Sequence, residues 1–176
     1  MEQWSRREVL KLGVLASTVA VSPKWVEAST ERNVALNRPA TADSQQNGTY
    51  GAKANDSDFN TTWYTGKPTV GNWWKVDLGT PHDLTGCRLM WHDPGFWYQY
   101  RIEVSADDAH WTTAVDMTRN RAAKWVPVHA FTAKDARYLR VTVTGMDDGC
   151  WLGIREVELF DTLPLPSAEY QAVYQR

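Results

Sequence analysis

The sequence predicts an all-β protein, an antiparallel β-sandwich of the jelly-roll type, and three observations carry this prediction. Short apolar stretches alternate with polar residues at a period of two, and turn-forming residues separate them at short intervals. No stretch shows convincing helical periodicity. Ten of the 176 residues are Trp, a side chain that suits β cores and flat stacking surfaces.

The first half of the chain contains two clear strand patterns. Residues 73–78 and 85–92 are expected as separate strands, and each is followed by a turn that contains Gly and Pro. In the second strand Cys87, Leu89 and Trp91 lie on one face. One buried face per strand is what a sandwich requires.

The second half continues the pattern. Residues 100–104 alternate cleanly, with Tyr100, Ile102 and Val104 inward, and a polar turn leads into a hairpin partner at 111–117. Further strands are expected at 125–131, at 137–144 (with Leu139, Val141 and Val143 on one face) and at 154–160. The last of these, 154–160, alternates in both registers, which indicates a central strand covered on both sides.

The first 28 residues are expected to be an export signal rather than part of the fold. Arg6-Arg7 precedes a mildly apolar run at 12–21, and Val26-Glu27-Ala28 fits the small-residue cleavage pattern, so the signal is twin-arginine-like. The apolar run is shorter than the roughly 20 residues that span a bilayer, so no membrane anchor is expected. The expected domains are a signal at 1–28, a linker at 29–32, a folded module at 33–160 and a C-terminal tail at 161–176.

Cleavage would leave 15 basic and 18 acidic side chains, a net charge of −3. Such a charge gives no sign of nucleic-acid binding. We expect a secreted or cell-surface bacterial protein, in a compartment where calcium is abundant. Cys87 and Cys150 could pair in an oxidising compartment. Their expected places, early in a strand and in a loop near the other end of the fold, could put them too far apart to bond, so the pairing stays open.

Residues 53–63 are the most unusual polar stretch. Oxygen-bearing side chains stand at alternate positions from Asp56 to Thr61, which is what calcium selects. An EF-hand is excluded, because Thr61 stands where that loop needs Gly and Lys67 stands where it needs Glu. From these residues alone, a solvated polar turn explains the stretch equally well.

Several segments, taken in order, resemble one known family. They are 33–40 (Asn-Val-Ala-Leu-Asn-Arg-Pro-Ala), 54–63 (Ala-Asn-Asp-Ser-Asp-Phe-Asn-Thr-Thr-Trp), 73–79 (Trp-Trp-Lys-Val-Asp-Leu-Gly), 100–105 through Trp111, 136–141 and 154–160. Together they resemble the discoidin, or coagulation factor 5/8 type C, domain, and within it the bacterial carbohydrate-binding modules of family 32. The resemblance covers about residues 33–160 and implies a discoidin-type, galactose-binding-domain-like sandwich.

The resemblance also implies a structural calcium. Its ligands would be the Lys53 carbonyl, Asp56, Asp58, Thr61 and, from the last strand, Glu156. A remote carboxylate of this kind would fasten the last strand to the early loop. Two family glycines are replaced, by Ser57 and Ala109. If those positions need positive φ, each replacement strains its turn.

Ligand recognition is expected on loops at one rim, where an aromatic face meets the apolar side of a sugar ring and polar groups meet its hydroxyls. For every aromatic among the candidates, core packing is the alternative. The candidates are His92, Phe96, Trp97, Arg119, Asn120, Arg121, Trp151, Tyr64 and Asn72.

We therefore expect a non-catalytic module that binds terminal sugars of glycans, galactose-type sugars first, as a monomer and without nucleic acid or membrane insertion. A carbohydrate-active enzyme is a further possible partner. Catalysis is disfavoured because no Gly-x-Ser-x-Gly, His-Glu-x-x-His or phosphate loop occurs, and the acids occupy turns or alternating strand surface. The alternatives are a protein- or lipid-binding adhesion domain, and an accessory module of an enzyme that has no ligand of its own.

Overall fold

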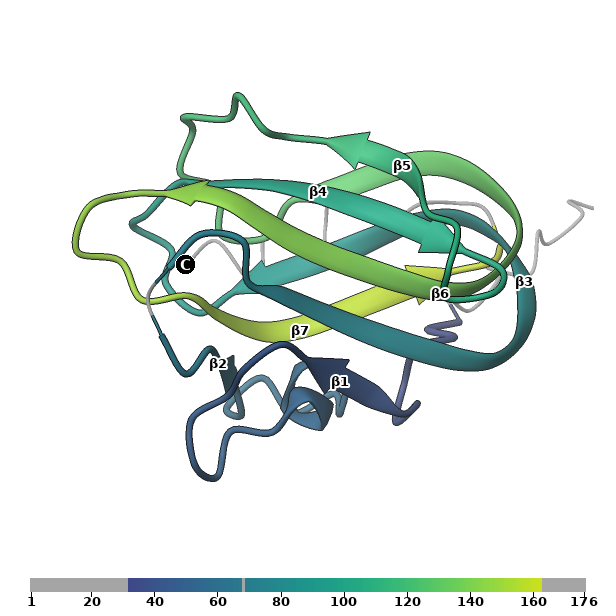
Figure 1. Cartoon of the computed structure of the whole chain (residues 1–176), viewed down its shortest axis with the longest axis horizontal. Helices are drawn as coiled ribbons and strands as arrows, with labels where there is room; N and C mark the ends of the chain where they lie inside the picture. The colour runs from purple at the N-terminus through teal and green to yellow at the C-terminus, as the bar shows by residue number, and fades with distance from the viewer. Residues whose placement is uncertain (1–31, 68, 163–176) are drawn as a thin grey trace, which may run out of the picture.

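A computed structural model describes residues 32–67 and 69–162. The expected export signal and almost all of the expected tail lie outside these residues. The described part contains one short 3₁₀ helix, η1 (Gly51–Ala54), which the sequence did not predict. No helix within it is both long and apolar enough to cross a bilayer. The strands are β1 (Ala40–Ala42), β2 (Trp63–Tyr64), β3 (Trp73–Trp91), β4 (Tyr98–Ser105), β5 (Thr112–Asp116), β6 (Val128–Met146) and β7 (Gly153–Phe160) (Figure 1).

Two strands are much longer than predicted. The patterns at 73–78 and 85–92 belong to the single strand β3, and those at 125–131 and 137–144 belong to the single strand β6, which begins at Val128. The expected break after residue 78 was wrong because bulges absorb the irregular residues. The pairing register of β3 with β6 shifts repeatedly between Asp77 and Gly86, so the strand bends without ending.

This bending builds the sandwich. The first half of β3 pairs with the second half of β6, and the second half of β3 pairs with the first half of β6. The strand order is β2-β7-β3-β6-β4-β5, with β1 added to β3, and all pairs are antiparallel. The two long strands therefore run through both layers, as their curvature in Figure 1 shows. The predicted antiparallel sandwich is confirmed.

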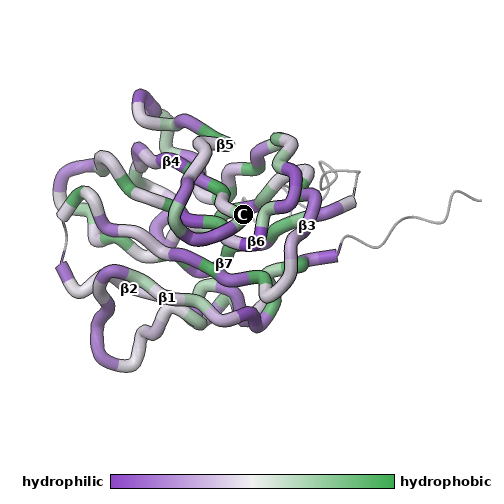
Figure 2. Tube along the Cα trace, turned by 45° about the vertical axis from the view of Figure 1, so that its right-hand side comes forward, coloured by the Kyte–Doolittle hydropathy of each residue, from purple (hydrophilic) through white to green (hydrophobic). Residues whose placement is uncertain are grey.

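The core follows the predicted alternation. The inward residues of the second half, from Tyr100 to Val143, are buried as expected. Strand β7 is buried along nearly its whole length because it lies between β2 and β3, which confirms its expected central place. Figure 2 shows the alternating hydropathy along the strands. Of the eight Trp residues in the described part of the chain, three are fully buried, namely Trp63, Trp74 and Trp91.

Both cysteines are buried and free. Cys150 lies in the β6–β7 loop, where its Sγ donates a hydrogen bond to the Tyr98 hydroxyl at 3.1 Å. Cys87 is packed in β3, and burial raises the pKa of its thiol to about 12. Neither sulfur is therefore a reactive thiolate at neutral pH.

The two ends of the folded module lie side by side. Asn33 forms an isolated antiparallel bridge with Phe160, and the Val34 N–H donates to the Leu159 carbonyl at 2.9 Å. The Asn33 side chain also accepts the Leu159 N–H at 3.1 Å. These contacts lie where β7 ends, whereas the β6–β7 loop lies at the other end of the sandwich (Figure 1).

Acidification is expected to destabilise the fold through His129. Its Nε2 lies 2.8 Å from the Tyr100 hydroxyl, and burial lowers the pKa of this imidazole to about 4. The unfolded chain takes up this proton near pH 6.5 and the folded chain only near pH 4, so stability falls as pH drops across that window. Allowing for partial exposure, we expect a loss of about 2 kcal/mol.

Urea denaturation between pH 7 and pH 4 measures this loss. Carboxylates also contribute to acid sensitivity, so the variant His129→Gln provides the reference. The wild type should lose more stability than the variant across the window. Equal losses in the two proteins would contradict the assignment.

Candidate functional site

The loop between η1 and β2 gathers oxygen atoms around Thr61. The Thr61 Oγ1 lies 2.9 and 3.0 Å from the two carboxylate oxygens of Asp56, 3.1 Å from the Lys53 carbonyl oxygen and 3.0 Å from the Asp58 carbonyl oxygen. A hydroxyl has one proton and can donate it to one acceptor at a time. The remaining contacts bring acceptors close together, an arrangement that a hard cation would stabilise.

Glu156 reaches this loop from β7. The side chain is buried, and its Oε2 accepts the Ser57 N–H at 3.1 Å. Its Oε1 is buried without a hydrogen-bond partner in the described part of the chain. Burial, together with the neighbouring Glu158, raises the pKa of Glu156 to about 8. A buried carboxylate with an unsatisfied oxygen is costly unless a proton or a cation compensates it.

The donor set fits calcium, because every converging atom is oxygen. The Asp58 carboxylate turns away, since its Oδ1 accepts the backbone and side-chain N–H groups of Asn60, and only its carbonyl oxygen faces Thr61. No three His, Cys, Asp or Glu side chains converge anywhere in residues 32–67 and 69–162. A metal here would therefore depend on carbonyl and hydroxyl oxygens beside Asp56 and Glu156.

Replacing Ser57 by Gly is expected to stabilise the protein by roughly 0.5–1 kcal/mol. Ser57 has φ of 59°, the left-handed region in which a Cβ is unfavourable. At the second replaced glycine the condition for strain is not met, because the positive φ of 63° belongs to Asp108 and not to Ala109. Ala109→Gly is the matched control and should give no gain. Thermal unfolding of both variants tests this, and equal effects would contradict the backbone argument.

The rim is formed where β6 ends and β7 begins (Figure 1). The β6–β7 loop is fixed at both of its ends. The Asp147 N–H donates to the Trp97 carbonyl at 3.1 Å, and the Trp151 indole N–H donates to the Thr65 carbonyl at 3.0 Å. The structure thus brings Trp97, Trp151 and the residues that follow β2 to one end of the sandwich.

Tyr64 and His92 form the centre of this rim. The Tyr64 hydroxyl lies 2.6 Å from His92 Nδ1 and 2.9 Å from Nε2, and the two rings meet edge to face with centroids 4.6 Å apart. Burial and the nearby Arg155 lower the pKa of His92. The imidazole is therefore neutral at pH 7 and can both accept and donate a hydrogen bond.

Gly153 permits this pairing. A Cβ at Gly153 would lie 2.7 Å from a ring carbon of Tyr64 and 2.9 Å from the His92 Cβ. Real side chains do not approach so closely, so only Gly leaves room for both rings. Sequence reasoning missed this residue, because a Gly at a strand start has no distinguishing pattern.

Trp97 and Arg121 form a second pair at the rim. The Arg121 guanidinium lies 4.0 Å from the centroid of the half-buried Trp97 ring, so it covers one face of the indole. Phe96 packs against the hydrophobic core, which is the alternative expected for a loop aromatic. Arg119 is exposed on the same loop as Arg121.

Two predicted site residues have their side-chain amides engaged within loops. Asn72 is buried, and its Nδ2 donates to the carbonyls of Lys67 at 3.0 Å and Thr69 at 2.5 Å. Asn120 donates to the Tyr98 carbonyl at 2.9 Å. Both side chains hold loop conformations, so a direct ligand contact would require them to exchange these bonds.

Trp151 is the most accessible aromatic of the rim, with 40% of its surface exposed. Together with Val70, which is 58% exposed, it borders a shallow hollow of about 410 Å³. Asp147 and Asp148 also line this hollow. An exposed indole beside carboxylates can stack on a sugar ring and accept hydrogen bonds from its hydroxyl or ammonium groups.

Arg155 was also missed as a site residue. Its Nε donates to the His92 carbonyl at 3.2 Å and its Nη1 to the Phe59 carbonyl at 2.8 Å. It therefore joins the rim to the loop that gathers around Thr61. The available signal was its place: a charged residue in a strand expected to be covered on both faces needs partners.

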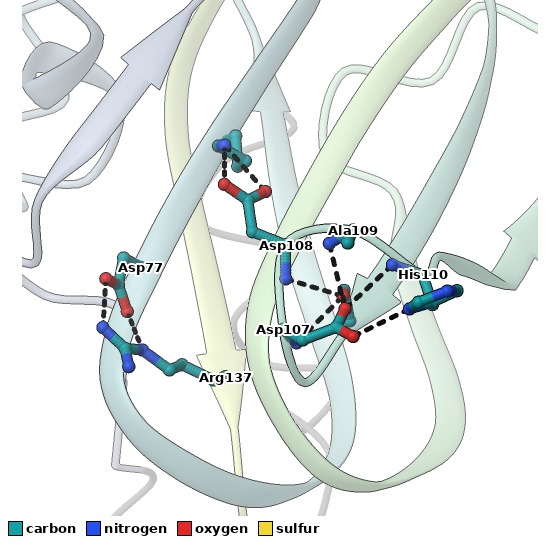
Figure 3. Close-up of polar contacts among 8 residues, drawn as sticks. Asp77, Asp107, Asp108, Ala109, His110 and Arg137 are labelled. Carbon is teal, nitrogen blue, oxygen red and sulfur yellow. Dashed lines mark hydrogen bonds and ion pairs between the residues drawn. The ribbon is translucent and has the colours of Figure 1, made fainter.

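Acidic residues outside the rim and the 53–61 loop form hydrogen bonds that support strands and turns. Figure 3 shows that the Arg137 guanidinium donates two hydrogen bonds of 2.8 Å to the Asp77 carboxylate. These bonds lower the pKa of that carboxyl. Asp107 closes the β4–β5 turn by accepting the Ala109 and His110 N–H groups, and its pKa is lowered mainly by these bonds with His110. These carboxylates are ionised turn and strand supports and not poised general acids.

Similar solved structures define the class of protein. Chitosan-binding module 1 of a Paenibacillus sp. IK-5 chitosanase/glucanase is 28% identical, with a TM-score of 0.67 over 73% of this chain and 98% of that one. Module 2 of that enzyme, in complex with chitotriose, is 26% identical, with a TM-score of 0.66 over 73% and 99%. The fold is thus that of carbohydrate-binding β-sandwich modules.

The chain belongs to the F5/8 type C domain family, whose model matches residues 39–157. Curated relatives include galactose oxidase of Gibberella zeae, which is 26% identical in an alignment of 144 positions that covers 74% of this chain. The match spans only 21% of that protein. The Clostridium perfringens module CpGH89CBM32-4, in complex with GlcNAc-α-1,4-galactose, shares the fold at 22% identity and a TM-score of 0.66, over 74% of this chain and 94% of that one.

Proposed function

We propose that this chain is an exported, non-catalytic module that binds terminal sugars of glycans at the rim of Tyr64, His92, Trp97 and Trp151. The observation that carries the proposal is the exposed indole of Trp151, held by Thr65 next to the Tyr64–His92 pair. The indole supplies a stacking face, and the neutral imidazole supplies hydrogen bonds for sugar hydroxyls. A single shallow site of this kind should have a Kd of roughly 10 μM to 1 mM.

Galactose-type sugars come first in the proposal. The similarity to a segment of galactose oxidase supports this choice. Amino sugars are the second candidate, because Asp147 and Asp148 line the hollow beside Trp151 and two similar modules are chitosan-binding. Carboxylates at that place would pair with a sugar ammonium group.

We also propose that the loop at 53–61 and Glu156 hold a structural calcium. The Lys53 and Asp58 carbonyls, the Asp56 carboxylate, the Thr61 hydroxyl and the Glu156 carboxylate would be its ligands. The orphaned Glu156 oxygen and the crowded oxygens around Thr61 support this assignment. When bound, the ion would neutralise these carboxylates and fasten β7 to the loop.

A binding panel tests the sugar proposal. Isothermal titration with methyl galactoside, chitotriose and lipid vesicles separates a sugar module from a lipid-binding adhesion domain. Nuclear magnetic resonance titration should show shifts of the Trp151 indole N–H on sugar addition. Binding of vesicles or of proteins without any response to sugars would reject the proposal.

Replacing Trp151 by Ala is expected to weaken sugar binding about tenfold, because a stacking contact of this kind contributes on the order of 1 kcal/mol. Trp111→Ala is the matched control. Trp111 is half-buried, and the Arg140 guanidinium lies 4.2 Å from its ring centroid. It directly precedes β5, a strand that begins at the end of the sandwich away from the rim (Figure 1). It should leave the affinity unchanged, and equal losses in both variants would contradict the assigned place.

Export and a monomeric state complete the proposal. The twin-arginine-like segment at 1–28 supports export. Detection of the processed protein outside the bacterial cytoplasm, and its mass in solution by light scattering, test the two statements. A dimer at micromolar concentration would reject the second.

A further inference from the structure

A second hollow, of about 320 Å³, lies between the loop around Thr61 and the rim. None of its lining residues is acidic, and two of them, Lys53 and Arg155, are cationic. Asn60, Thr61 and Tyr64 also line it and bring an amide and hydroxyl groups. The hollow thus combines positive charge with neutral donors, the opposite of the hollow that Asp147 and Asp148 line.

Of the two cationic residues, Lys53 and Arg155, Arg155 has its charge less compensated by carboxylates. Its Nε and Nη1 donate to backbone carbonyls, of His92 and Phe59, and no carboxylate pairs with it among the described residues. The side chain is half-buried, so water screens its charge incompletely. Its charge already contributes to the lowered pKa of His92. An anion placed in the hollow would supply the missing compensation.

Lys53 adds to the positive potential. Its Nζ lies 3.5 Å from the Asp56 Oδ2, beyond a good hydrogen bond, and its side chain is 42% exposed. The Asp56 carboxylate is shared with the Thr61 hydroxyl, and the Asp58 carboxylate is turned toward Asn60. Neither acid lines the hollow. The Lys53 ammonium can therefore turn toward an anion bound there.

We propose that this hollow binds the carboxylate of an acidic sugar, a uronic acid unit of a glycan. Lys53 and Arg155 would attract the carboxylate, and the Tyr64 hydroxyl and the Asn60 amide would contact the hydroxyls of the ring. Tyr64 is shared, since it lines this hollow and also meets His92 at the rim. One glycan could thus reach both places. The identity of the ligand as a sugar rests on the proposed function.

Trigalacturonate and its methyl ester are the probes, because they have the same shape and differ in charge. We expect the acid to bind at least fivefold more tightly than the ester at low salt, with shifts of the Asn60 and Thr61 amide signals. In Lys53→Gln and in Arg155→Gln, the two probes should bind with about equal affinity, provided that the circular dichroism of each variant matches that of the wild type. Lys134→Gln removes an equally charged, exposed side chain far from the hollow and should keep the advantage.

The outcomes separate the two proposals. If the ester shifts the Trp151 indole signal but the acid binds no more tightly, the hollow is not a carboxylate site and the rim proposal stands. If the acid shifts only the Asn60 and Thr61 amides, the hollow is supported; the rim proposal fails only if methyl galactoside and chitotriose also leave the Trp151 indole signal unchanged. If Lys53→Gln and Lys134→Gln reduce the advantage equally, the attraction is general and the inference is overturned. If neither probe shifts any signal, the hollow proposal fails, and the rim proposal is decided by methyl galactoside and chitotriose.

Discussion

Chelation of calcium by EGTA is expected to lower the melting temperature of this protein by roughly 10 °C, provided that calcium was present at about 100 times its Kd. Without the ion, Glu156 must either stay buried as a carboxylate with an unpaired oxygen or take up a proton, and the oxygens around Thr61 repel one another. Differential scanning calorimetry of one sample with calcium and with EGTA measures the change. An unchanged melting temperature would count against the metal site.

The variant Glu156→Gln sharpens this test. Its neutral amide lacks the charge that calcium needs, so the response to calcium should nearly disappear. In EGTA at pH 8, however, the variant should be at least as stable as the wild type, because it buries no carboxylate. Asp83→Asn, which removes an exposed carboxylate paired with Lys134, is the control and should respond fully. A full calcium response in Glu156→Gln would reject Glu156 as a ligand.

Replacing Gly153 by Ala is expected to abolish most sugar binding while leaving the fold intact, with an affinity loss of tenfold or more. The new methyl group overlaps the Tyr64 ring and the His92 Cβ. Tyr64 is half-exposed and can swing outward, so the strain is relieved at the rim rather than in the core. Loss of the Tyr64–His92 hydrogen bond then leaves the imidazole without its fixed orientation.

Gly145→Ala is the matched control for this change. A Cβ at Gly145 would also meet a neighbour, but the overlapping atom is the end of the flexible Gln99 side chain, which can rotate away. Isothermal titration with the sugar that the panel identifies should show normal binding in this variant. Sugar binding that survives in Gly153→Ala would show that the Tyr64–His92 pair is not part of the site.

The strands could be predicted from the sequence because their signal is local. Alternation identified the inward faces of β4 and β7, since a single strand contains the whole pattern. The continuity of β3 could not be predicted. Gly79 has φ of 82° and Pro81 follows it, and these residues usually end a strand, whereas here the bulges are stabilised by pairing with β6, residues far away in sequence.

In the candidate site, too, features with a local sequence signal could be predicted, whereas features that depend on distant contacts could not. Ser57 could be identified as a strained position because the family resemblance supplied the expected glycine, but the same reasoning placed the second strain one residue too late, at Ala109. The aromatic candidates were named from their places in predicted loops, which local turn signals indicate. The role of Arg155 depends on two backbone carbonyls from distant loops, and no sequence pattern encodes such contacts. Such contacts can be identified only from the three-dimensional structure.

The pairing of Asn33 with Phe160 determines how the module can be carried within a larger architecture. Strand β7 runs from the rim at Gly153 to Phe160, eight residues or about 25 Å. Any linker attached at either boundary would leave from one shared point at the end of the sandwich opposite the rim. A module attached in this way can rotate about that point while the rim faces outward, and it can lie between two neighbouring domains without separating them.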